Sequence, residues 1–298
     1  MATNTLSDVT MRHLGSGVCV FEGAITLDWD WVYEEVKKLV SEDVANMYTP
    51  TINPETGKPA LLNKSGYLFS SASFLSMPGR CSSAHQRTDE KIKQFLKFLE
   101  DSKDYYLLQY LARFPLAYKN IWWKVKGHIV GYKQEHQQYL GVHSDTSADY
   151  VYGFDHPSDQ LATRNTLSCI VYFNDCDDDM SNTTKNSFSG GHHVFDELGI
   201  RYIPRKGDII MFPSNFIASH LVEPVTRGER YSYLGWYCHG SPNSSFNESI
   251  VDPIKDPAMA TMATNVYIPT LREDLKSYLE KNNTDKSSQA YCLVRDGF

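Results

Sequence analysis

The chain has 298 residues, of which 41% are hydrophobic and 22% are charged, and its formal net charge at pH 7 is −7. A chain of this length buries a substantial core without disulfides or metals as staples. The acidic balance argues against a protein whose main partner is a phosphate backbone, because such binding needs clustered Lys and Arg.

The N-terminal segment has no basic stretch that leads into an apolar run, so we expect no secretory signal. No apolar segment reaches the roughly 18 to 20 residues needed to span a bilayer. The six cysteines include no CxxC pair, which favours free thiols in a reducing compartment over a disulfide framework. These features predict a soluble, cytoplasmic protein with no membrane partner.

Helical periodicity characterises much of the first third of the chain. Apolar residues recur at helical spacing over residues 29–40, and Asp28 can serve as the N-cap. The pattern returns over residues 92–99, after Asp89, and residues 106–111 carry it toward Phe114. Residues 48–66 are rich in Pro, Gly, Asn and Thr, which predicts a long irregular connection.

From residue 121 the pattern changes to short β-branched and aromatic runs separated by turn residues. The predicted strands cover residues 124–132, 166–173, 192–195, 208–212, 219–225 and 230–238. No helical pattern alternates with them, which disfavours a parallel sheet and favours a sandwich or jelly roll. Two loops, 150–165 and 175–189, interrupt the strands, and either could cover a site.

The C-terminal part is a Ser- and Asn-rich stretch followed by a helix from Leu271 to about Lys281, with Thr270 and Glu273 as a capping box. We therefore expect three regions within one compact domain. They are a partly helical support region over 1–120, a β-rich core over 121–240 and an extension with one helix over 241–298.

The pattern His143-Ser144-Asp145, with His220 further along the chain, points to a metal site. On an extended segment His143 and Asp145 lie on one face, since strand side chains alternate. His220 would supply a third ligand from a distant strand. Two histidines and one carboxylate bind non-heme Fe(II) with open coordination positions, which predicts oxygen chemistry.

Five segments together resemble the Fe(II)- and 2-oxoglutarate-dependent oxygenases, and within them the prolyl 4-hydroxylase-like branch. They are HSD at 143–145, RNTLSCIVYFND at 164–175, GGHHVF at 190–195, PRKGDIIMFPS at 204–214 and SHLVEPVTRGERYSYLGW at 219–236. The resemblance covers about residues 124–237. It implies a mainly β fold with flanking helices, in which 121–240 form a catalytic core of the double-stranded β-helix (jelly-roll) type.

The resemblance also implies the ligands of this core. His143, Asp145 and His220 would bind Fe(II), 2-oxoglutarate would chelate the metal as co-substrate, O2 would take the last position and ascorbate would serve as reductant. Arg230 is the natural partner of the 5-carboxylate, because its guanidinium binds carboxylates bidentately. Prolyl hydroxylases commonly carry Lys at the matching position, so this arginine is a departure.

Three further residues are candidates for binding the co-substrate. Tyr172 and Ser232 could contact the same carboxylate as Arg230, although core packing or a strand-surface position explains each equally well. Tyr139 lies one position away from the family's tyrosine, and a one-residue slip reverses the strand face unless a bulge intervenes.

Four other histidines require separate interpretation. His192 and His193 are adjacent, so they point to opposite faces of a strand and cannot easily both reach one iron. We expect His128 and His136, which precede the triplet, on a strand surface.

The resulting hypothesis is an enzyme that hydroxylates an unactivated C–H bond of a peptide or an amino-acid-like small molecule, with succinate and CO2 as co-products. Related halogenases lack the carboxylate ligand so that halide can bind, and the presence of Asp145 therefore favours hydroxylation. Two alternatives remain open: a jelly-roll protein that binds metal or ligand without turnover, and a 2-oxoglutarate-dependent nucleic-acid demethylase, which the acidic balance disfavours. The sequence indicates no oligomeric state.

Overall fold

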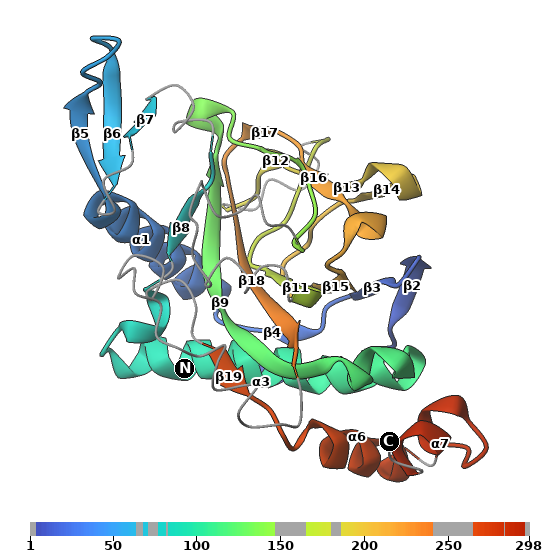
Figure 1. Ribbon diagram of the computed structural model, residues 1–298. Coiled ribbons are helices and arrows are strands. Elements are labelled where there is room, and N and C mark those ends of the chain that lie inside the picture. The colour runs from blue at the N-terminus through green and yellow to red at the C-terminus, as the bar shows by residue number, and fades with distance from the viewer. Residues whose placement is uncertain are drawn as a thin grey trace.

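The computed structural model describes residues 4–63, 68–70, 77–81, 83–146, 165–179, 186–240, 265–282 and 284–295. Its centre is a large antiparallel sheet in which the strands follow the order β19, β9, β18, β11, β15, β3, β2, and β8 also pairs with β9 (Figure 1). These strands are β2 (Arg12–Gly15), β3 (Val18–Phe21), β8 (Gly79–Cys81), β9 (Ile121–Lys133), β11 (Asn165–Tyr172), β15 (Ile209–Pro213), β18 (Glu229–His239) and β19 (Asn265–Tyr267).

A smaller antiparallel sheet faces the large one. Its strands follow the order β10 (Leu140–His143), β16 (His220–Val222), β13 (His193–Phe195) and β14 (Ile200–Tyr202). Two short strands, β12 (Ser189–Gly190) and β17 (Val225–Arg227), pair with each other beside it, and β1 (Thr5–Leu6) pairs with β4 (Ile25–Thr26). Two facing antiparallel sheets with helices outside them confirm the predicted mainly β, jelly-roll class.

The alternation of side chains along β11 explains why the large sheet is covered on both faces. Cys169 and Val171 belong to an apolar cluster with residues of α1 (Trp29–Met47) and α3 (Glu90–Arg113). Ile170 and Tyr172 point the other way and pack with residues of the small sheet. Consistent with this division, α1 and α3 lie on one side of the large sheet and β13, β14 and β16 on the other (Figure 1). The side facing the small sheet is called the inner face below.

The second long helix follows the apolar pattern that begins after Asp89 and runs toward Phe114. It is α3, one helix of 24 residues whose N-cap Asp89 accepts a hydrogen bond from the Ile92 amide at 3.0 Å. The step in the apolar pattern from Leu99 to Tyr106 has a physical cause. Lys103 and Glu100 face the sheet as a buried ion pair, 3.0 Å apart, so polar residues occupy positions that the apolar periodicity leaves blank.

The prediction of an irregular connection over 48–66 was wrong. Strands β5 (Tyr48–Ile52), β6 (Pro59–Asn63) and β7 (Leu68–Ser70) form a separate three-stranded sheet that extends away from the rest of the molecule in Figure 1. The Asn53 side chain accepts a hydrogen bond from the Glu55 amide at 2.8 Å, and Gly57 adopts φ +67°. The turn residues therefore close a hairpin instead of continuing a loop.

The C-terminal extension contains two helices, α6 (Leu271–Lys281) and α7 (Gln289–Arg295), where one was expected, and both pack on α3. Thr270 precedes α6 but its side chain does not cap the helix, because its hydroxyl bonds the Asp274 carboxylate at 3.0 Å instead. Across the described residues, no helix is both long and apolar enough to cross a membrane. Residues 150–164 of the first predicted loop and 180–185 of the second lie outside the described residues.

Candidate metal centre and co-substrate site

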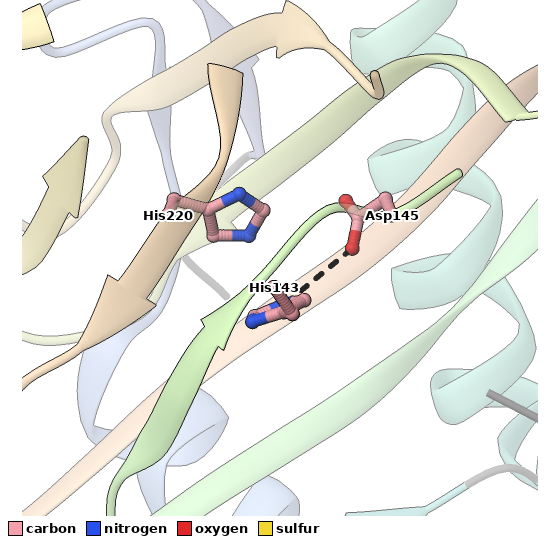
Figure 2. Close-up of side chains that lie close together, drawn as sticks. All are labelled: His143, Asp145 and His220. Atoms are coloured by element: carbon pink, nitrogen blue, oxygen red, sulfur yellow. Dashed lines mark ion pairs between the residues drawn. The ribbon is translucent and has the colours of Figure 1, made fainter. Parts of the chain in front are cut away.

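Strands β10 and β16 bring the two predicted histidine ligands together. His143 and His220 are directly paired across these strands, and their ring centroids lie 4.3 Å apart. The expectation that Asp145 continues the same strand was wrong, because β10 ends at His143. Asp145 nevertheless returns toward the histidine, with Oδ1 3.6 Å from His143 Nε2 (Figure 2). One ligand atom from each of the three residues lies within 4.8 Å of the others.

Backbone carbonyls orient both imidazole rings. His143 Nδ1 lies 2.7 Å from the carbonyl oxygen of Gly141, and His220 Nδ1 lies 3.1 Å from that of Ala218. A carbonyl only accepts, so each Nδ1 carries the proton and donates it. Each Nε2 then keeps its lone pair, which is the tautomer that binds a metal.

Asp145 is held in its charged form. It is 4% exposed, and Ser168, itself 2.8 Å from the Ser214 hydroxyl, donates a hydrogen bond to Asp145 Oδ2. Burial opposes ionisation, but the adjacent histidine rings and the hydrogen bond from Ser168 hold the pKa of Asp145 below its usual range. Burial lowers the pKa of His220 to about 4. At neutral pH the cluster therefore offers a carboxylate and a neutral imidazole, the forms that bind a metal.

Arg230 on β18 is 1% exposed on the inner face of the large sheet. Its guanidinium carbon lies 4.7 Å from the ring centre of Tyr132 and 5.3 Å from that of Tyr172. Among the described residues, its Nε has no hydrogen-bond partner and no carboxylate lies within ion-pair distance. A buried charge without a counterion is costly, so this position fits an anionic ligand such as a carboxylate.

The other predicted co-substrate residues have different outcomes. Tyr172 is fully buried, its hydroxyl lies 2.9 Å from His193 Nδ1, and it pairs across the strands with Ser232, which is 3% exposed. Tyr139 is 45% exposed, and the described tyrosine rings beneath the Arg230 guanidinium are those of Tyr132 and Tyr172. Tyr132 was missed because only the register of β9 against β18 places it directly opposite Arg230.

His193 and His192 point in opposite directions, as expected. His193 is fully buried, its ring centroid lies 4.7 Å from that of His220, and burial holds its pKa well below the usual value. His192 instead contacts Asp178 and Glu223. His193 therefore packs against the metal cluster and His192 belongs to a separate group of side chains.

The expectation that His128 lies on a strand surface was wrong. β9 is covered on both faces, so His128 is 5% exposed, and burial lowers its pKa to about 3. Its ring lies 5.3 Å from that of Trp236, which pairs across the strands with Ser168, the residue that holds Asp145. Neither His128 Nε2 nor Trp236 Nε1 has a hydrogen-bond partner in the part of the chain that the structure describes.

The residues present fit both groups that the sequence predicts. Two imidazoles and one carboxylate leave open positions on a six-coordinate Fe(II), and the buried guanidinium suits the far carboxylate of a dicarboxylate ligand.

Comparison with known families gives one match. Residues 127–238 match the 2OG-Fe(II) oxygenase superfamily, and this segment contains the three candidate metal ligands, Arg230 and Tyr132. No curated protein matches the chain.

Several solved structures are similar to the chain at low identity. A prolyl hydroxylase from Trichoplax adhaerens, in complex with a hypoxia inducible factor peptide fragment, has 14% identity and a TM-score of 0.45 over 75% of this chain and 84% of its own. A Pseudomonas putida prolyl-4-hydroxylase has 17% identity and a TM-score of 0.40 over 76% and 94%. The viral collagen prolyl hydroxylase of Paramecium Bursaria Chlorella virus-1 has 16% identity and a TM-score of 0.38 over 56% and 82%.

Proposed function

We propose that this chain, whose residues 127–238 belong to the 2OG-Fe(II) oxygenase superfamily, hydroxylates a C–H bond of a peptidyl or amino-acid-like substrate, with succinate and CO2 as co-products. The chain is a 2-oxoglutarate/Fe(II)-dependent dioxygenase, and the superfamily implies Fe(II), 2-oxoglutarate and O2. One observation carries the finer proposal. Three ligating groups converge on the inner face of the sheets, where Arg230 is buried without a carboxylate partner among the described residues.

In this proposal His143 and His220 hold Fe(II) through Nε2, and Asp145 holds it through its carboxylate. Fe(II), when bound, supplies the oxygen activation that C–H hydroxylation requires. Arg230 binds the 5-carboxylate of 2-oxoglutarate, and its charge is available at any relevant pH. The hydroxyl of Tyr172 is positioned by His193, whose lowered pKa keeps its ring neutral.

Asp145 supports hydroxylation over halogenation. Halogenases of this chemistry leave the carboxylate position free for halide, whereas Asp145 is buried and fixed by Ser168. A carboxylate with a lowered pKa stays charged and remains a ligand throughout the neutral range.

Two ring nitrogens near the proposed metal site have no hydrogen-bond partner among the described residues. An unpaired buried donor or acceptor costs about 1 to 3 kcal/mol, and His128 Nε2 and Trp236 Nε1 are both unpaired among the described residues. Trp236 lies beside Ser168, which holds Asp145, and the His128 ring contacts that of Trp236, so both rings belong to the buried surroundings of the proposed metal site.

The test is succinate formation from 2-oxoglutarate by the purified chain with Fe(II) and ascorbate under air, together with mass spectrometry of a peptide library for the gain of one oxygen. We expect turnover in the unaltered chain and its loss in His143→Ala and His220→Ala. His136→Ala, a partly exposed histidine of the same region, is the matched control and should retain activity. Full turnover in both ligand variants would reject the assignment.

A second measurement separates an oxygenase from a jelly-roll protein that merely binds metal. With Mn²⁺ in place of Fe(II), 2-oxoglutarate should raise the unfolding temperature, because a ligand that binds only the folded state stabilises it. A metal-loaded protein whose unfolding temperature does not respond to 2-oxoglutarate would favour the non-catalytic alternative.

A further inference from the structure

A second cluster of ligating side chains lies outside the iron site. Cys176 Sγ, a carboxylate oxygen of Asp178 and His192 Nε2 all lie within 4.8 Å of one another. His192 is 1% exposed, Cys176 is partly buried, and the Asp178 side chain is 43% exposed. Because His192 and His193 point to opposite sides of the chain, this cluster and the iron site are separate.

The backbone holds the cluster in place. Cys176 forms a β-bridge with Phe188, and its amide donates to the Pro204 carbonyl at 2.9 Å. Cys176 and Asp178 are two positions apart, which places them on one face of an extended segment. The amide of Gly190, two residues before His192, donates to Asp178 Oδ1 at 2.9 Å.

The separations within the cluster resemble those around a tetrahedral zinc ion. Cys176 Sγ lies 3.5 Å from His192 Nε2 and 3.5 Å from Asp178 Oδ1. Zinc bonds of about 2.3 Å to sulfur and about 2.0 to 2.2 Å to nitrogen and oxygen give tetrahedral edges of about 3.6 Å for sulfur–nitrogen and sulfur–oxygen. The other carboxylate oxygen, Asp178 Oδ2, lies 2.7 Å from His192 Nε2, which is about 0.6 Å shorter than a nitrogen–oxygen edge around zinc. Metal binding therefore requires the partly exposed Asp178 carboxylate to turn, so that one oxygen faces the ion.

The other face of the His192 ring has the support typical of a metal-bound histidine. His192 Nδ1 lies 2.5 Å from Glu223 Oε2, and Arg201 clamps Glu223 with bonds of 3.0 and 2.9 Å. When the carboxylate accepts a hydrogen bond from Nδ1–H, the Nε2 lone pair remains free to bind a metal. Arg201 Nη2 also lies 2.7 Å from Nδ1, so the opposite tautomer, with Nε2–H donating to Asp178, fits the contacts as well. A bound cation selects the first tautomer.

The Cys176 thiol must lose its proton to become a metal ligand. A divalent cation can displace the thiol proton, so that a sulfur–metal bond forms, the S–H bond breaks and one proton is released to solvent.

We propose that Cys176, Asp178 and His192 form a second metal site for a four-coordinate divalent cation of the zinc type, with water as the fourth ligand. Its mixed sulfur, nitrogen and oxygen donors suit Zn²⁺ and differ from the all-nitrogen-and-oxygen set of the iron site. Zinc would tie the segment after β11 to the small sheet next to His193. The proposal does not depend on the oxygenase activity.

The test uses Co²⁺ as a spectroscopic substitute for Zn²⁺ on the full chain freed of metal by a chelator. A cobalt–thiolate charge-transfer band reports only sites with a cysteine ligand, and the iron site has none. We expect this band to saturate at one equivalent of Co²⁺ above any taken up by the iron site, and Zn²⁺ to abolish it. It should persist in His220→Ala, which separates this proposal from the proposed function.

Variants identify the ligands. Cys176→Ser should remove the band, whereas Cys292→Ser, which alters another partly exposed cysteine, should leave it unchanged. Glu223→Gln should weaken Co²⁺ binding about 10- to 100-fold, the usual effect of removing a carboxylate behind a metal-bound histidine. Circular dichroism of the metal-free variants checks that each is folded. If Cys176→Ser does not fold, Asp178→Asn is tested in its place and should weaken Co²⁺ binding at this site. The proposal is overturned if the unaltered chain shows no band, or if the band survives Cys176→Ser or disappears in Cys292→Ser.

Discussion

Replacing Arg230 by methionine should separate co-substrate binding from stability. The long side chain of methionine fills much of the same volume but cannot bind a carboxylate. If Arg230 pairs with the 5-carboxylate of 2-oxoglutarate, Arg230→Met removes one partner of a buried charge pair. Such losses cost about 2 to 5 kcal/mol. The hydroxyls of Tyr132, Tyr172 and Ser232 remain as donors, so we take the lower part of this range, about 2 to 3 kcal/mol. The apparent KM for 2-oxoglutarate should therefore rise about 30- to 150-fold.

The stability of the cofactor-free protein should respond differently. Burying a guanidinium without a counterion costs several kcal/mol, which its contacts with the Tyr132 and Tyr172 rings partly offset at about 1 to 2 kcal/mol each. Arg230→Met removes both contributions. The free energy of unfolding without 2-oxoglutarate should thus stay within about 1 kcal/mol of the original value or increase.

Steady-state kinetics at varied 2-oxoglutarate and urea unfolding of the cofactor-free chain provide the two readouts. Arg227→Met is the matched control, because Arg227 lies three residues away and bonds Ser189 and the Asp177 carbonyl at the surface. That control should leave the KM for 2-oxoglutarate unchanged. The reasoning is refuted if Arg230→Met lowers stability by several kcal/mol with an unchanged KM, since Arg230 would then be a structural residue.

Three further predictions concern residues around the core and the metal cluster. Burial alone would raise the pKa of Glu100, but its lysine partners and hydrogen bonds hold the pKa below the usual range. Its contribution to the free energy of unfolding is therefore present above the unfolded pKa and decreases as pH falls from about 5. Glu100→Gln should lower the free energy of unfolding by about 3 to 5 kcal/mol at pH 7 and reduce this acid dependence, as measured by urea titrations. A Cβ on Gly127 would lie 2.5 Å from an aromatic ring and 2.8 Å from a main-chain carbonyl, so Gly127→Ala should lower the free energy of unfolding by about 1 to 3 kcal/mol. A Cβ on Gly141 has no neighbour within 4 Å, so Gly141→Ala should lower it by less than about 1 kcal/mol, and thermal unfolding measures both. Ser168→Ala removes the hydrogen bond that orients Asp145, so Fe(II) affinity, measured by activity against added metal, should fall about 10- to 100-fold, and an unchanged affinity would contradict that role.

Local patterns predicted most strands of the core but not the whole architecture. The run 124–132 was recognised as a strand because β-branched and aromatic residues mark it, and the structure has β9 there. The same pattern does not predict which strands pair: β3, near the N-terminus, pairs with β15, almost two hundred residues away. Short apolar segments carry no information about their partner strands, since pairing depends on contacts distant in the chain.

A buried ion pair fills a gap in the helical pattern of α3. The apolar positions step from Leu99 to Tyr106, and Lys103 and Glu100 pair between them inside the core. A sequence pattern treats both as solvent-facing residues. The hairpin at 48–63 was missed for a related reason: its turn residues were recognised, but only cross-strand pairing shows that they join two strands.

The proximity of His143, Asp145 and His220 was the most predictable part of the candidate site, because they are chemically distinctive residue types at a distinctive spacing. The sequence by itself determined these candidates, the mainly β class and the choice of Arg230 as a carboxylate partner. Only the tertiary structure decided that Tyr132 replaces Tyr139 beside that arginine. It alone brought Cys176, Asp178 and His192 together. In both cases strand register and chain reversal set the distance between side chains, and neither is encoded in the spacing of residues along the chain.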